Sequence, residues 1–117
     1  MTLSVDRCRY VDDELIPIDW DYPETLAGFE DTRCRLWGSA ALIALGARML
    51  PELRNGDIYC YPERLDQLEA DIRLVLGHLD ELACAAGYGS DYIAERATNI
   101  LNAVLWARRN AGGVIIW

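Results

Sequence analysis

The stretch that decides the fold is PERLDQLEADIRLVLGHLDELA, residues 62–83. Its main apolar residues are spaced by steps of 3, 4, 3, 4 and 3, which places them on one face of a helix: Leu65, Leu68, Ile72, Val75, Leu79 and Leu82. Pro62 favours a helix that begins there. Because the pattern covers fewer than three heptads and Gly77 lies near its middle, it favours a bundle helix over a free coiled coil. The sequence therefore predicts that this face packs in the core.

A second amphipathic helix is predicted over residues 91–110, after the glycine break at 87–89. Its apolar stripe comprises Ile93, Ala97, Ile100, Leu101, Val104 and Leu105. Gly112-Gly113 ends this helix, and the four apolar residues of 114–117 follow it. Four such residues favour burial, so we expect a strand here that pairs with residues 15–20 or 57–61.

Residues 32–50 are predicted to form one long helix that ends before Pro51. From Leu36 to Leu45 the sequence is apolar nearly all round. Such a helix is buried on several sides, or it is shared with another chain. A homodimer through the apolar helix 36–50 is therefore possible, and a self-associating structural module is one of the alternatives for function.

The N-terminal segment is predicted to contain two short strands, Cys8–Val11 and Leu15–Trp20, joined by an acidic turn. Tyr22-Pro23 has the pattern of a helix start, and Asp57–Tyr61 that of a further strand. The fold class that follows is α+β and helix-dominated. A three-helix bundle is edged by a small sheet from the N-terminal segment, residues 57–61 and the C-terminal strand, in a single domain of residues 1–117.

Negative charge is concentrated in residues 1–31, which hold nine carboxylates against two arginines and so carry −7 of the net charge of −8. Residues 32–117 hold ten carboxylates against nine arginines. An acidic patch of this kind attracts basic partners and disfavours direct binding to nucleic acid or to anionic membranes. With no signal peptide and no apolar run long enough to span a bilayer, the expected location is the cytoplasm.

Few residues have the spacing of a catalytic or metal site. The four cysteines, Cys8, Cys34, Cys60 and Cys84, form no paired motif, so a zinc ribbon is disfavoured and reduced thiols are expected. The single histidine, His78, lies at the edge of the helix face, where a structural or solvated role is expected. We therefore expect no metal, no cofactor and no enzymatic activity.

Two surfaces are candidates for binding a partner. The first is the acidic N-terminal segment with interleaved aromatic residues: Asp12, Asp13, Glu14, Asp19, Trp20, Asp21 and Tyr22. Aromatic anchors framed by carboxylates suit a basic protein partner, although a solvated acidic loop is the alternative. The second is one face of the last helix: Tyr92, Glu95, Asn99, Asn102 and Trp106. The alternative for this face is that Trp106 packs against the N-terminal segment.

In size, in its acidic aromatic segment Asp19-Trp20-Asp21-Tyr22 and in its helical body ending in GGVIIW at 112–117, the chain resembles the small acidic immunity proteins of bacterial polymorphic toxin systems. The resemblance implies a non-enzymatic inhibitor that occludes a basic protein toxin, often a nuclease. A phage-encoded inhibitor of a nucleic-acid-binding host machine is an alternative. A small helical enzyme or ligand-binding domain with a pocket between the helices, near His78 or Cys84, is another.

Overall fold

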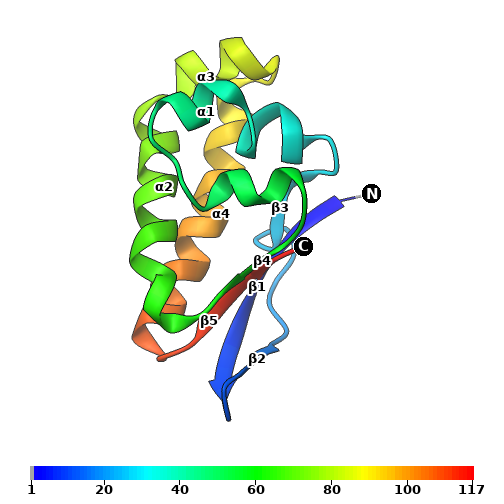
Figure 1. Ribbon diagram of the computed structural model, residues 1–117. Helices are drawn as coiled ribbons and strands as arrows, with labels where there is room; N and C mark the ends of the chain where they lie inside the picture. Colours follow the sequence, from blue (N-terminus) through cyan, green and yellow to red (C-terminus); the bar gives the residue numbers. More distant parts are fainter. Residues whose placement is uncertain (1) are drawn as a thin grey trace.

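Strands from both ends of the sequence lie side by side in one antiparallel sheet (Figure 1). The computed structural model describes residues 2–117. The central strand is β1 (Thr2–Val11), which pairs along one edge with β2 (Glu14–Pro17) and β3 (Leu26–Phe29). Along its other edge β1 pairs with β5 (Gly113–Ile116), which also pairs with β4 (Ile58–Cys60).

The helices cover one face of the sheet and one end of it (Figure 1). The longest, α4, contacts β1, β3 and β5 and is packed in turn against α2 and α3. The helical elements of the described residues are a π-helical turn η1 (Arg33–Trp37), α1 (Ala40–Ala44), the 3-10 turns η2 (Leu50–Arg54) and η3 (Pro62–Arg64), α2 (Leu65–Gly77), α3 (Leu79–Ala86) and α4 (Ser90–Arg109). None of them is long and apolar enough to cross a membrane.

The C-terminal strand lies inside the sheet, where β5 is hydrogen-bonded to β1 on one side and to β4 on the other. All four of its residues are buried. Two glycines before and at the start of β5 allow the backbone to fit between its neighbouring strands. A Cβ at Gly112 would collide with the carbonyl oxygen of Cys8, and one at Gly113 would lie 2.5 Å from the carbonyl oxygen of Cys60. The double glycine thus ends α4 and lets the chain enter the sheet.

The predicted fold class is confirmed, since the structure is α+β and its sheet contains the N-terminal, 57–61 and C-terminal segments. The core face predicted from residues 62–83 is confirmed at Leu65, Leu68, Ile72, Val75 and Leu82, all buried, while Leu79 is half-buried. The predicted helix over 91–110 is α4. The C-terminal strand pairs with the 57–61 segment as predicted, and its other neighbour is β1 rather than residues 15–20.

The single long helix predicted over residues 32–50 is wrong. The chain instead forms η1, α1 and η2. The first helical turn ends at Gly38, where the chain passes so close to Arg54 that a Cβ would lie 2.6 Å from the Arg54 Cβ, and Ser39 caps α1 by accepting a hydrogen bond from Leu42 N–H at 3.2 Å. The apolar residues expected on a surface shared with another chain mostly lie in the core of the same chain. The exceptions are Ala40, Ile43 and Ala44, which are exposed; Ile43 is 50% exposed.

Two smaller predictions also differ from the structure. The helix expected after Tyr22-Pro23 is absent: residues 22–25 form a turn, with a cis Tyr22–Pro23 peptide, and lead into β3, which pairs with the start of β1. The helix expected beyond Pro62 is divided at His78, which lies between α2 and α3 with a φ of −135°. Strand pairing in the first case and the glycine before His78 in the second outweigh local helix preference.

Candidate functional site

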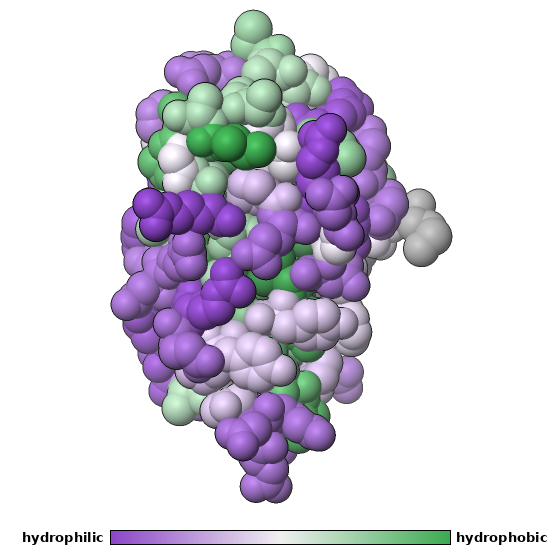
Figure 2. All heavy atoms as spheres, in the orientation of Figure 1, coloured by the Kyte–Doolittle hydropathy of each residue, from purple (hydrophilic) through white to green (hydrophobic). Residues whose placement is uncertain are grey.

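The hairpin that joins β1 and β2 ends in a two-residue turn formed by Asp12 and Asp13, whose φ angles are 52° and 63°. Tyr10 supports the turn by donating a hydrogen bond from its hydroxyl to Asp13 Oδ1 at 3.1 Å. Glu14 follows at the start of β2, and all three acidic residues are exposed. In Figure 2 the hairpin tip is the hydrophilic projection at the bottom of the molecule.

After β2 the chain remains exposed almost without interruption to residue 24. We call residues 11–24 the acidic edge. It carries six carboxylates, none of which forms an ion pair with another residue of the described chain: Asp12, Asp13, Glu14, Asp19, Asp21 and Glu24. It also holds four of the eight large hydrophobic residues that are strongly exposed in residues 2–117: Val11, Ile16, Trp20 and Tyr22. Unpaired charge and exposed apolar area therefore occur together here.

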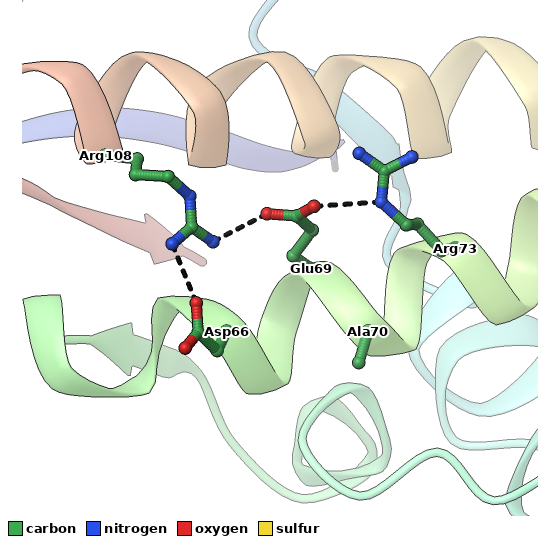
Figure 3. A pocket seen from close by; sticks show the side chains of 5 residues that line it. All are labelled: Asp66, Glu69, Ala70, Arg73 and Arg108. Atoms are coloured by element: carbon green, nitrogen blue, oxygen red, sulfur yellow. Dashed lines mark hydrogen bonds and ion pairs between the residues drawn. The ribbon is translucent and has the colours of Figure 1, made fainter.

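The carboxylates between α2 and α4 are arranged differently from those of the acidic edge. Between α2 and α4, Arg108 pairs with Asp66 at 2.7 Å and with Glu69 at 2.6 Å, and Glu69 also accepts from Arg73 at 2.9 Å (Figure 3). The hydrogen bond from Arg73, together with Arg108, lowers the pKa of Glu69. The open depression lined by these residues thus has its charges matched internally. It is a weaker candidate for a charged partner than the acidic edge.

The two candidate surfaces predicted from the sequence meet in the structure. Trp106 packs edge-on against Trp20, with ring centroids 6.3 Å apart. The Asn99 amide donates hydrogen bonds to the carbonyl oxygens of Pro23 at 3.1 Å and Leu26 at 2.9 Å. The face of α4 that was the second candidate therefore holds the end of the acidic edge in place.

Of the three remaining residues on that face of α4, one packs against the sheet and two are exposed. Tyr92 stacks on Phe29 with ring centroids 6.1 Å apart and accepts a hydrogen bond from the Phe29 N–H at 3.2 Å. Glu95 and Asn102 are exposed, and Glu95 pairs with Arg96 at 2.9 Å. Only these two residues of the five are left as an open surface, which makes the α4 face a support for the first candidate surface.

The open edge of β2 is poorly suited to pairing with a further strand. Ile18 N–H donates to the carbonyl oxygen of Arg7 at 2.9 Å, so alternate residues of β2 direct their backbone groups toward β1. Leu15 and Pro17 then direct theirs to the open edge, where Pro17 has no N–H to donate. A partner at this edge would therefore be recognised mainly through side chains.

The thiols and the histidine are not assembled into a nucleophilic site. Burial raises the pKa of Cys8 to about 11 and that of Cys60 to about 12, which disfavours their reactive thiolate forms. Cys34 and Cys84 are exposed. The Nδ1 atom of His78 lies 2.8 Å from the carbonyl oxygen of Leu74 at the end of α2. Within residues 2–117 no group of three His, Cys, Asp or Glu side chains could hold a metal ion.

Sequence reasoning missed Arg7. Its side chain is on the helix-facing side of β1 with Leu3 and Val5, and only 4% of the residue is exposed. The guanidinium carbon lies 3.9 Å from the centroid of the Trp20 ring, so Arg7 packs against the inner face of Trp20 in a cation–π contact. The strand alternation Leu3, Val5, Arg7 was the signal in the sequence, since it places a cation at an inward position.

Comparisons with known protein families, with curated proteins and with solved structures found no match.

Proposed function

We propose that this chain is a non-enzymatic, cytoplasmic binding protein that neutralises a basic protein partner by occlusion, with the acidic edge as its binding surface. The mode of action is that of the immunity proteins that the sequence resembles, and the partner would be a toxin such as a nuclease. The observation that carries the proposal is the set of six carboxylates without ion pairs, interleaved with four exposed hydrophobic residues.

The electrostatic part of the argument concerns the rate of association. Unpaired carboxylates on a projecting edge set up a negative potential that reaches about 8 Å into physiological salt. Such a field accelerates encounter with a basic surface. Carboxylates already neutralised by arginine, such as those between α2 and α4, contribute little to it.

The apolar part of the argument concerns the lifetime of the complex. Trp20 is 40% exposed, yet one part of its ring is fixed against Arg7 and Trp106. A side chain already held in position loses little conformational entropy when it is buried by a partner. Tyr22 is 77% exposed and extends the apolar area beside it. These two residues are the expected anchors.

The first experiment is co-expression with the product of the adjacent gene. The expected result is that the adjacent gene product alone arrests growth and that this chain restores it. An adjacent gene product that is harmless, or whose toxicity this chain does not relieve, contradicts the toxin assignment.

The second experiment assigns the surface by comparing binding rates of purified variants. Asp19→Arg with Asp21→Arg should slow association and reduce its salt dependence, whereas Trp20→Ala should speed dissociation by roughly 30-fold or more, the equivalent of about 2 kcal/mol. The matched control is Asp80→Arg with Glu81→Arg, which makes the same change of charge at the exposed start of α3. If the control pair slows association as much as the first pair, the acidic edge is not the binding surface.

A further inference from the structure

The sheet has a second face, which points away from the hydrophobic core shared with the helices. Strand register places Asp6, Ile115 and Tyr59 in one row across β1, β5 and β4. Side chains alternate between the two faces of a strand, so every second residue from these positions lies on the same side. We call this side the outer face. Its aromatic residues are Tyr10, Tyr59, Tyr61 and Trp117, and none of them packs against the core cluster.

One half of the outer face combines an aromatic pair with a carboxylate. The rings of Tyr59 and Trp117 lie at 76° to each other with centroids 6.3 Å apart, and the two residues are 47% and 42% exposed. The Trp117 indole N–H donates a hydrogen bond to Asp6 Oδ2 at 2.6 Å. Asp6 forms no ion pair within residues 2–117, so the negative charge beside these rings has no internal partner.

The other half has the same composition. The rings of Tyr10 and Tyr61 lie at 83° with centroids 5.9 Å apart, and the Tyr10 hydroxyl donates to Asp13 Oδ1 at 3.1 Å. Asp13 forms no ion pair in the described part of the chain either. Tyr61 follows Tyr59 by two residues, and its backbone is extended, with φ −70° and ψ 162°. Alternate residues of an extended chain are about 6.6 Å apart, which sets the spacing of the two halves.

Other rings of the molecule are already covered by arginine. Trp20, Tyr88 and Tyr92 each have a guanidinium carbon 3.9–4.5 Å from the ring centroid. Within residues 2–117 the four rings of the outer face have no such contact. A cation is attracted to the face of an aromatic ring and makes stronger hydrogen bonds to an ionised carboxylate. Each half of the outer face thus offers both groups to a cation from another molecule.

We propose that the outer face binds an extended basic peptide segment in which two arginines are separated by one residue. One guanidinium group stacks on each aromatic pair and forms an ion pair with Asp6 or Asp13. Arginine fits better than lysine, because its flat group can stack on a ring and donate two parallel hydrogen bonds to a carboxylate. The spacing of the two halves equals that of alternate residues in an extended peptide.

Charge favours this occupant over a second copy of the chain. The outward positions of β1, β2, β4 and β5 include Asp6 and no arginine, and two chains of net charge −8 repel each other. Asp6 and the rings lie outside the acidic edge, and only Asp13 belongs to both surfaces. This proposal and the proposed function can therefore fail separately.

The test is a titration of the whole protein followed by the NMR signals of its indole N–H groups. The probe is an acetylated and amidated glycine pentapeptide with arginine at its second and fourth positions. It should shift the Trp117 signal saturably and bind about fivefold more tightly than the same peptide with two lysines or with adjacent arginines. Equal binding of the arginine and lysine peptides, or no saturable shift at Trp117, overturns the proposal.

Asp6→Asn removes the charge of one half and keeps an oxygen that can accept from Trp117. It should weaken binding of the arginine peptide by up to about fivefold, the usual effect of losing one exposed ion pair. Asp80→Asn is the matched control, because Asp80 is exposed at the start of α3 and forms no ion pair there. Equal weakening by both variants would indicate only long-range attraction and would overturn the site.

Tyr59→Leu tests the aromatic rings while an apolar side chain still covers the buried Ile115 opposite it. It should weaken binding by about threefold or more, whereas Tyr22→Leu, on the acidic edge, should leave it unchanged. A larger effect of Tyr22→Leu would place the peptide on the acidic edge and overturn the proposal. A Trp117 signal that shifts with protein concentration alone would indicate a second copy and overturn it as well.

Discussion

Replacing Asp71 by alanine should be among the most damaging single changes in this protein, although the residue is polar. Asp71 lies on α2 and is only 2% exposed. Its Oδ2 atom accepts hydrogen bonds from the backbone N–H groups of Met49 at 2.7 Å, Leu50 at 2.9 Å and Arg48 at 3.1 Å. Leu50 begins η2, so this carboxylate satisfies N–H groups that the first turn of a helix leaves without partners.

The magnitude follows from the donors that the substitution leaves unpaired. The hydrogen bonds from Met49 and Leu50 are buried, and each unsatisfied buried donor costs about 1–3 kcal/mol. The two together give roughly 2–6 kcal/mol, out of a total stability of about 5–15 kcal/mol for a domain of ordinary stability. Asp71 also lines an open depression with Gly46 and Leu74, from which water can reach the vacated space. The lower half of the range is therefore expected.

Asp71→Asn provides the finer test, because an amide oxygen can take the place of Oδ2 and keep the hydrogen bonds without the charge. We expect a loss of about 1–3 kcal/mol, the difference between charge-assisted and neutral hydrogen bonds at two donors. The assay is urea unfolding followed by circular dichroism, with Asp80→Ala as the exposed control, for which less than about 1 kcal/mol is expected. A cost of Asp71→Ala no larger than that of the control would refute the reasoning.

Three further changes test the core, the C-terminal strand and the ion pairs between helices. Ile72→Ala should lower the free energy of unfolding by roughly 2–5 kcal/mol in the same urea assay, because Ile72 is fully buried; a cost below about 0.5 kcal/mol would mean that this face is not core. Gly112→Ala should destabilise by about 1–3 kcal/mol, whereas Gly77→Ala, at a helix end with open space around its Cβ, should be neutral or stabilise slightly; thermal midpoints compare the two, and a harmless Gly112→Ala would contradict the close approach of β5 to Cys8. Glu69→Gln should cost at most about 1 kcal/mol at neutral pH, as partly exposed ion pairs do. Because the folded-state pKa of Glu69 is lowered, its contribution is present above the unfolded pKa of about 4.3 and is lost as the pH falls through the folded value, so wild type and variant should converge in acid; a difference that persists at low pH would exclude this origin.

Much of the architecture follows from local sequence pattern. The apolar spacing of residues 65–82 and of α4, the alternation in β4 and the double glycine before β5 each act over a few residues and were predictive. The region of residues 32–54 was not predictable in this way. Its apolar residues fit a helix, but contacts distant in sequence decide its path: Arg54 packs against Gly38, and Asp71 holds the backbone at 48–50. Such contacts outweigh helix propensity because they satisfy the backbone groups that an interrupted helix leaves without partners.

The residue types of the candidate site could be predicted from the sequence, whereas the contacts that hold the site in place could not. The acidic residues and aromatic residues of the acidic edge are visible in the sequence, and so is the polar face of α4. The α4 face supports the acidic edge through Asn99, whose amide donates to two carbonyl groups more than 70 positions earlier in the chain. This contact is not visible in the sequence. An asparagine in the middle of a helix is unfavourable for helix formation, and this contact supplies the reason for it.

In the acidic edge, the residues proposed to bind a partner are mostly different from the residues that stabilise the fold. The exposed carboxylates make no internal ion pairs, so their replacement removes no side-chain contact except the hydrogen bond that Asp13 accepts from Tyr10. The residues that position them, Asn99 and Trp106, belong to the longest helix and contact the same segment from its inner side. A surface of unpaired charge can be maintained on a small domain only if its backbone is held by contacts of this kind, because the like charges repel one another. Charged residues of the acidic edge can therefore be replaced with little effect on stability. Asn99, Trp106 and Arg7, in contrast, are constrained both by folding and by their role in positioning the binding surface.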